Sequence, residues 1–185
     1  MDSNNVVERL ALHKLWVYGK KDGVRADFSY EDLSGINLSH AVLTKAFLCH
    51  TNLEGADLSY SDLSYAWLPN AKLVKCNLSH ANLASCTIDK VDLSYSNLRN
   101  ANLRSAYLVD SKICNADLWG AELQYANLKG ADLRGSNLDA ADLGGADLRS
   151  AQLDRDRLKH ADTTDTISES QPWTVENSNV GYTSI

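Results

Sequence analysis

The stretch "ADLRGSNLDAADLGGADLRS", residues 131–150, repeats one five-residue phrase four times. Each phrase begins with a small residue, continues with Asp or Asn and has Leu at its third position, as in Ala131, Asp132 and Leu133. A period of five matches neither the 3.6-residue turn of an α-helix nor the two-residue alternation of a strand. The fold therefore has to be derived from the repeat itself.

The same period extends over most of the chain. Residues 26–160 divide, with no insertion, into twenty-seven consecutive pentapeptides. The third residue is Leu in all but three of them, where Phe28, Ile88 and Ile113 stand instead. On a helix, five residues advance by about 500°, which would spread these apolar side chains around the whole circumference. A coil in which each pentapeptide makes one short extended side and one turn would instead point all of them inward.

The fifth position of the pentapeptide carries the turn signal. Gly and Asn tolerate positive φ, which tight turns often require. They occupy this position at Gly35, Gly55, Gly120, Gly130, Gly135, Gly145, Asn70, Asn100 and Asn115. Asp and Asn at the second position are expected to point outward and to hydrogen-bond the turn backbone.

This pattern resembles the pentapeptide-repeat family, whose motif is A(D/N)LXX. The resemblance covers about three quarters of the chain. It implies an all-β solenoid, a right-handed quadrilateral β-helix with four pentapeptides per coil and about seven coils. Residues twenty apart in the sequence would then stack directly above one another.

Three segments are expected. In residues 1–25, Val6, Val7, Leu10, Leu15 and Trp16 can form the apolar stripe of a helix from about residue 4 to 18, which would cap the first coil. The phrase "LALHKLWVYGKKDGVRADF", residues 10–28, is similar to the leader found before the repeats in some bacterial and phage family members. Residues 26–160 form the β-helix, and the polar residues 161–185 are predicted to be a flexible tail.

Composition argues against several classes of function. The net charge of -6 and the pI near 5.3 disfavour direct binding to nucleic acid. The chain contains no run of about 18 apolar residues, so no membrane contact is expected. The first residues lack the basic start and cleavage site of a signal peptide, and a cytoplasmic location is therefore predicted.

No sequence pattern predicts catalysis. The chain lacks the usual phosphate-binding, dinucleotide, zinc-protease and serine-hydrolase motifs, and its four cysteines show no metal-ligand spacing. His40 and His80 share a column, but they are two layers apart, about 9.6 Å, with Tyr60 between them. One zinc ion cannot bridge that distance. We predict no catalytic, cofactor-binding or metal-binding residues, no cofactor and no small-molecule substrate.

One outward column departs from the Asp/Asn rule. Stacking by twenty places these second-position residues in one column: Asp27, Phe47, Trp67, Thr87, Tyr107, Asn127 and Asp147. Val42 lies around the corner from Phe47, and Val109 is on the same side as Tyr107. One interpretation is an aromatic ladder that strengthens contacts between layers. The other is a candidate interaction surface of Phe47, Trp67, Tyr107, Val42 and Val109.

The sequence thus predicts a non-enzymatic interaction or scaffold protein that binds a protein partner, or a second copy of itself, through an outer face of the β-helix. The chain's own tail, through Trp173, is a further candidate for covering that face. The alternative, implied by resemblance to the quinolone-resistance group of the family, is a DNA mimic that binds a type II topoisomerase such as gyrase. Against it, basic residues are spread among the acidic ones, including Arg99, Arg104, Arg134 and Arg149.

Overall fold

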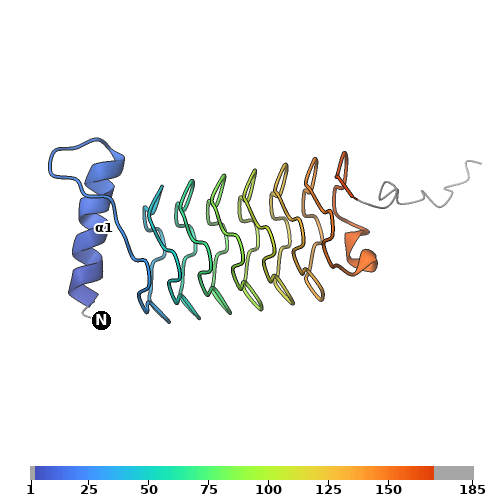
Figure 1. The fold of residues 1–185 in the computed structure, drawn as a ribbon, viewed down its shortest axis with the longest axis horizontal. Coiled ribbons are helices and arrows are strands. Elements are labelled where there is room, and N and C mark those ends of the chain that lie inside the picture. The colour runs from blue at the N-terminus through green and yellow to red at the C-terminus, as the bar shows by residue number, and fades with distance from the viewer. Residues whose placement is uncertain (1–2, 169–185) are drawn as a thin grey trace, which may run out of the picture.

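The computed structural model describes residues 3–168 as one α-helix followed by an elongated solenoid (Figure 1). The helix, α1, spans Ser3–Val17, close to the predicted range of 4–18. A 3-10 helix, η1, spans Arg155–Leu158 near the other end of the solenoid. Within residues 3–168, no helix is long and apolar enough to cross a membrane.

Each turn of the solenoid takes twenty residues, as predicted. Parallel bridges join second-position residues twenty apart, from Asp27 with Phe47 to Asp147 with Ile167. Every bridge is isolated, so the described residues contain bridge positions rather than continuous strands. Trp67 is typical, because its N–H donates to the Ala46 carbonyl (2.9 Å) and its carbonyl accepts from the Leu48 N–H (2.8 Å).

The fifth position turns the corner with positive φ, as the Gly and Asn residues there predicted. Asn70 has φ of 57° after Pro69, and the Ala71 N–H donates across this turn to the Leu68 carbonyl (3.0 Å). Bulkier residues adopt the same conformation, including Tyr60 at 57° and His80 at 58°. Such residues rarely take positive φ. The interlayer hydrogen bonds of the whole solenoid therefore fix this conformation, and residue identity alone does not reveal it.

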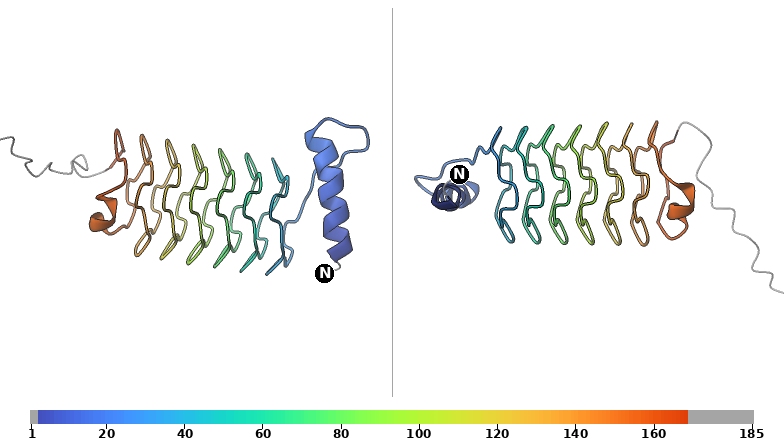
Figure 2. Two further views of the ribbon diagram at one scale, coloured as in Figure 1. Left: turned by 180° about the vertical axis from the view of Figure 1, so that it is seen from behind. Right: turned by 90° about the horizontal axis from the view of Figure 1, so that it is seen from below.

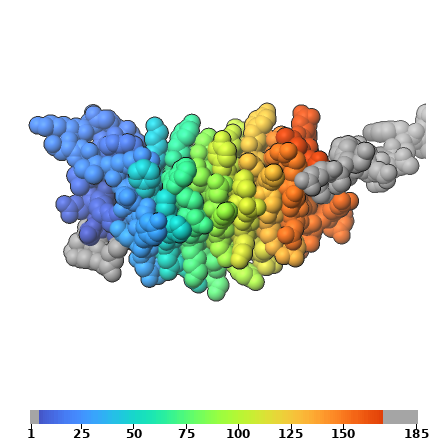
Figure 3. All heavy atoms as spheres, viewed as in Figure 1, coloured from blue at the N-terminus to red at the C-terminus, as the bar shows by residue number. Residues whose placement is uncertain are grey.

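The core is a continuous column of third-position side chains. All of them from Phe28 to Leu148 are buried, and the small first-position residues fill the space beside them. Serines at the first position are buried without loss of hydrogen bonding, since Ser61 Oγ donates to the Leu58 carbonyl (2.7 Å) and Ser96 Oγ to the Leu93 carbonyl (2.6 Å). On the face seen in Figure 3, successive layers lie in contact along the rod.

Helix α1 crosses the amino end of the rod (Figures 1 and 2). Val6 is buried in the core cluster and Leu10 packs against it, whereas Val7 is 66 % exposed. The predicted stripe was therefore wrong at Val7 and also at Leu15, which is exposed. The inward face consists of Val6, Leu10 and His13, because residues three and four apart lie on one side of a helix.

The predicted range of regular pentapeptides, residues 26–160, is wrong at its end: η1 replaces the regular turn at Arg155–Leu158, where Arg157 forms no bridge, and the bridges resume beyond residue 160. Asp162 and Ile167 form bridges with Asp142 and Asp147, although the third-position Leu has been replaced by Thr163. The bridge uses only backbone groups, so it persists where the Leu signal ends. Residues 169–185, the rest of the predicted tail and its Trp173, lie outside the described residues.

Candidate functional site

Most second-position Asp and Asn side chains bind the turn of their own pentapeptide. Asp57 Oδ1 accepts from the Ser59 N–H (3.0 Å), and Asn97 Oδ1 accepts from the Arg99 N–H (3.1 Å). The backbone hydrogen bond from Ser59 holds the pKa of Asp57 below its usual value. These contacts confirm the predicted role of the outward Asp and Asn residues in the turns.

Asn makes a second bond that sequence reasoning missed. Asn77 Nδ2 donates to Asp57 Oδ1 one layer before it (3.1 Å), and Asn97 Nδ2 donates to Asn77 Oδ1 (3.1 Å). We call this set the amide column: Asn37, Asp57, Asn77, Asn97, Asp117 and Asn137. Asp and Asn are therefore not equivalent here. The sequence pattern that indicates this second bond is an Asn placed twenty residues after an Asp or Asn.

The aromatic column, defined as Phe47, Trp67 and Tyr107, lies where the sequence placed it. Phe47 bridges to Trp67, Trp67 to Thr87 and Thr87 to Tyr107. Trp67 is 46 % exposed and Tyr107 is 53 % exposed, whereas Phe47 is partly buried. Val42 and Val109 are partly buried as well. The structure thus brings Phe47 and Trp67 into adjacent layers and leaves Tyr107 two layers beyond Trp67.

The aromatic side chains leave no turn N–H without a partner, although they cannot accept its hydrogen bond. The Cys49 N–H donates to Ser29 Oγ (3.3 Å), and the Val109 N–H donates to Asp89 Oδ1 (3.2 Å). After Trp67 the corresponding residue is Pro69, which has no N–H to satisfy. Each of the three aromatic departures from Asp or Asn is therefore compensated locally, and the aromatic rings do not disturb the coil.

Ring stacking occurs at a corner rather than in the aromatic column. The Tyr60 ring stacks on His40 (centroids 5.0 Å apart) and on His80 (4.8 Å apart). Among residues 3–168, no stacked ring pair includes Trp67 or Tyr107. Phe47 is covered instead by the Arg25 guanidinium, 3.6 Å from its ring centre. The two exposed rings of the aromatic column therefore keep their outer surfaces available.

Comparison with known sequences supports the repeat. The profile described as pentapeptide repeats matches in eight copies, over residues 24–59, 36–74, 61–104, 76–120 and 116–155. The chain belongs to the pentapeptide-repeat family. Within residues 3–168, the coil of four pentapeptides is thus that of a pentapeptide-repeat protein, and α1 precedes it.

Solved pentapeptide-repeat structures are similar to this chain. A protein from the thylakoid lumen of Arabidopsis thaliana is 29 % identical over 46 % of this chain, with a TM-score of 0.39. This chain spans only 56 % of that protein's length. HetL of the cyanobacterium Nostoc, involved in regulating heterocyst differentiation, is 24 % identical over 90 % of this chain and 92 % of its own (TM-score 0.33). QnrB1, a plasmid-mediated fluoroquinolone resistance protein, is 15 % identical over 76 % of this chain and 92 % of its own (TM-score 0.47).

A search of curated proteins gave no match.

Two of the four cysteines of this pentapeptide-repeat protein are buried in unreactive settings. Burial raises the pKa of the Cys76 thiol to about 12 and also raises that of Cys86. A thiol needs its thiolate form to act as a nucleophile or metal ligand. Within the described part of the chain, no three His, Cys, Asp or Glu side chains come together as a metal site would require.

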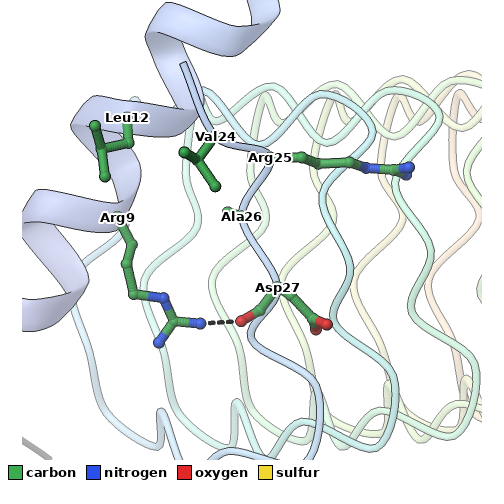
Figure 4. Close-up of a pocket in the computed structure, with 6 residues that line it drawn as sticks. All are labelled: Arg9, Leu12, Val24, Arg25, Ala26 and Asp27. Carbon is green, nitrogen blue, oxygen red and sulfur yellow. Dashed lines mark hydrogen bonds between the residues drawn. The ribbon is translucent and has the colours of Figure 1, made fainter. Parts of the chain in front are cut away.

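A small cavity of about 210 Å³ lies where α1 meets the first coil (Figure 4). Its lining consists of Arg9, Leu12, Val24, Arg25, Ala26 and Asp27. Both guanidinium groups already bind the protein: Arg9 donates to Glu31 and to the Asp27 carbonyl, and Arg25 donates to the Lys45 carbonyl. This cavity is therefore part of the cap contact, and the aromatic column remains the candidate site.

Proposed function

We propose that this pentapeptide-repeat protein is a non-enzymatic interaction protein that binds a protein partner, or a second copy of itself, through the aromatic column. The observation that carries the proposal is the exposure of Trp67 and Tyr107, 46 % and 53 %, without ring stacking on any described neighbour. Elsewhere on the solenoid, the second-position Asp and Asn side chains are engaged with their own turns or with an adjacent layer.

The chemistry of the two rings suits a protein partner. Trp and Tyr supply large contact areas at low conformational cost and are enriched at the energetic centres of protein interfaces. Bridges on both sides hold the Trp67 backbone, so little ordering is required when a partner binds. Tyr107 lies about 10 Å further along the same column, at two layers of about 4.8 Å each. One apolar patch on a partner can therefore contact both rings.

The remaining expectations are part of the same proposal. We propose that the protein has no catalytic activity, cofactor or small-molecule substrate. The raised pKa values of the Cys76 and Cys86 thiols support this, as do the guanidinium groups of the cavity, which already bind the protein. The protein acts in the cytoplasm, without direct contact to nucleic acid or membrane. We infer that the scaffold is a right-handed quadrilateral β-helix of about seven coils, supported by bridges at twenty-residue spacing from Asp27 to Ile167.

Photo-crosslinking tests this proposal. Trp67 is replaced by a photoreactive phenylalanine derivative in the full chain, and the protein is irradiated in an extract of its host. Trp119 provides the matched control, because it is also a partly exposed Trp (39 %) but lies at the fourth position of its pentapeptide, under the Arg99 guanidinium. We expect a discrete adduct from position 67 and none from position 119.

The adduct's mass and dependence on the extract identify the occupant. An adduct of twice the chain's mass, formed by the purified protein alone, would identify a second copy. A heavier adduct that requires the extract would identify another protein. Equal crosslinking from positions 67 and 119, or none from position 67, would contradict the proposal.

The DNA-mimic alternative receives less support. A DNA-like surface requires unneutralised carboxylates, but Asp132 pairs with Arg134 (2.6 Å) and Asp147 pairs with Arg149 (2.6 Å). A supercoiling assay with purified gyrase separates the two proposals. The alternative predicts inhibition, or protection from a quinolone, at micromolar protein, whereas an interaction protein of the proposed kind leaves the enzyme unaffected.

A further inference from the structure

His13 lies in the contact between α1 and the first coil. Its side chain is fully buried, and its Nδ1 accepts a hydrogen bond from the Ala26 N–H (3.0 Å). Its ring stacks on Trp16, with centroids 5.6 Å apart. Because Nδ1 is the acceptor, the ring is neutral and carries its hydrogen on Nε2. This histidine plays no part in the proposed function.

A second proton on His13 is incompatible with this contact. It would have to bind Nδ1, which would break the bond from Ala26 and leave a buried cation. Nε2 makes no hydrogen bond within residues 3–168, although the nearby Thr44 backbone favours the charged form. Burial lowers the pKa of His13, and its effect outweighs the opposing effect of the Thr44 backbone.

The surrounding charged groups do not offset such a cation. Arg25, from the segment after α1, is itself positive. Arg9, one turn earlier on the helix, pairs with Glu31 of the first coil (2.9 Å) and so uses that carboxylate. The Asp27 carboxylate accepts from the Ser29 N–H (2.9 Å). Figure 4 shows Arg9 directed at the Asp27 backbone from the helix side.

We propose that His13 makes α1 a pH-sensitive latch on the amino end of the solenoid, closed while His13 is neutral and released when it takes up a proton. In the released helix, His13 has an ordinary pKa of about 6.5. Proton uptake therefore favours release as the pH falls below about 6.5. One proton raises the opening equilibrium by up to about tenfold between pH 7.5 and pH 5.5, and the full factor is reached when His13 in the closed form does not titrate in that range.

Release has a structural consequence at this end of the rod. Val6 and Leu10 would leave the core, uncovering Phe28 and the unpaired backbone edge of the first coil. The segment that ends at Arg25, which covers the Phe47 ring, would also lose its anchor. Any effect of this second change on partner binding rests on the proposed function, whereas the latch does not.

Hydrogen–deuterium exchange of the full chain tests the latch. Exchange of α1 is measured at pH 7.5 and 5.5, corrected for intrinsic rates, with peptides from the centre of the solenoid as the internal reference. His13→Gln is the main variant, because its amide oxygen can accept the Ala26 N–H but cannot titrate. His80→Gln, at an exposed corner, is the matched control. Gly23→Ala supplies an open-cap reference, since its added Cβ would overlap the Trp16 backbone.

For the wild type and His80→Gln, we expect a severalfold loss of α1 protection at pH 5.5, up to about tenfold, with the reference peptides unchanged. His13→Gln should show no such difference. Equal loss of protection in wild type and His13→Gln, or no loss in wild type, would overturn the proposal.

If His13→Gln matches Gly23→Ala at both pH values, NMR titration of the wild-type histidines decides. Loss of α1 protection that follows the titration of His13 supports the latch, and protection that persists after His13 has titrated contradicts it.

Discussion

The amide column and the aromatic column occupy the same backbone position on different sides of one solenoid. Both consist of second-position residues joined by parallel bridges every twenty residues. In the amide column, Asn97 binds its own turn through Oδ1 and the preceding layer through Nδ2. In the aromatic column, Trp67 makes neither bond, and its turn contains Pro69 in place of an N–H donor.

The difference shows how a uniform scaffold can present one distinctive face. The amide column uses its hydrogen-bonding groups within the protein, so it adds stability and offers few groups to a partner. The aromatic column is not needed to complete the turns, because Ser29, Pro69 and Asp89 compensate for the missing acceptors. Its rings therefore alter the outer surface while the coil beneath stays the same.

The largest expected effect on stability comes from the amide column. Asn97→Thr removes the bonds to the Arg99 N–H and to Asn77, and we expect a loss of about 2 kcal/mol in the free energy of unfolding. Tyr107→Thr is the matched change, since Thr87 already stands between Trp67 and Tyr107 at the same backbone position, and the loss in the free energy of unfolding should be about half as large. Urea denaturation of both variants measures this contrast. Equal losses would remove the distinction between the columns.

A smaller effect tests the compensation at Pro69. Trp67→Asp alone should gain no turn hydrogen bond, because Pro69 has no N–H. Adding Pro69→Ser restores the donor, and the pair should be coupled by about 1 kcal/mol in a double-mutant cycle. Additive effects of the two substitutions on the free energy of unfolding would show that the missing N–H does not matter.

The smallest effect concerns acid stability of the amide column. The pKa of Asp57 is lower in the folded protein than its ordinary value, so its contribution is present above about pH 4 and is lost as the pH falls through the lowered pKa. Asp57→Asn keeps an oxygen acceptor for the turn but cannot titrate. Between pH 6 and pH 3, the free energy of unfolding should fall by a few tenths of a kcal/mol less for the variant than for wild type. The difference is small because the carboxylate is exposed to solvent. Denaturant midpoints at the two pH values measure the difference, and parallel curves would contradict this assignment.

The sequence was sufficient to predict the period, the stacking by twenty and the inward Leu residues, because all three follow from the spacing alone. It was insufficient at the ends. His13 shares a helix face with Val6 and Leu10, but a pattern of apolar residues does not include histidine, so this face could not be identified from the sequence. The bridges of Asp162 and Ile167 use backbone groups, so the loss of Leu concealed them.

The placement of the candidate surface was predictable, whereas its contacts were not. Columns of rings were visible in the sequence both at Phe47 and Trp67 and at the corner of His40, Tyr60 and His80. Only the side-chain directions show that stacking occurs at the corner. The cover that Arg25 places on Phe47 likewise depends on the path of the chain after α1.

The central claim is that the aromatic column contacts a partner. The most direct test measures the dissociation constant of the partner captured at position 67 for wild type, Trp67→Thr and Trp119→Thr. A ring at the centre of an interface contributes about 2 kcal/mol or more. We therefore predict at least tenfold weaker binding for Trp67→Thr and less than a twofold change for Trp119→Thr, with all three proteins folded. A Trp67→Thr protein that binds within twofold of wild type would contradict the account.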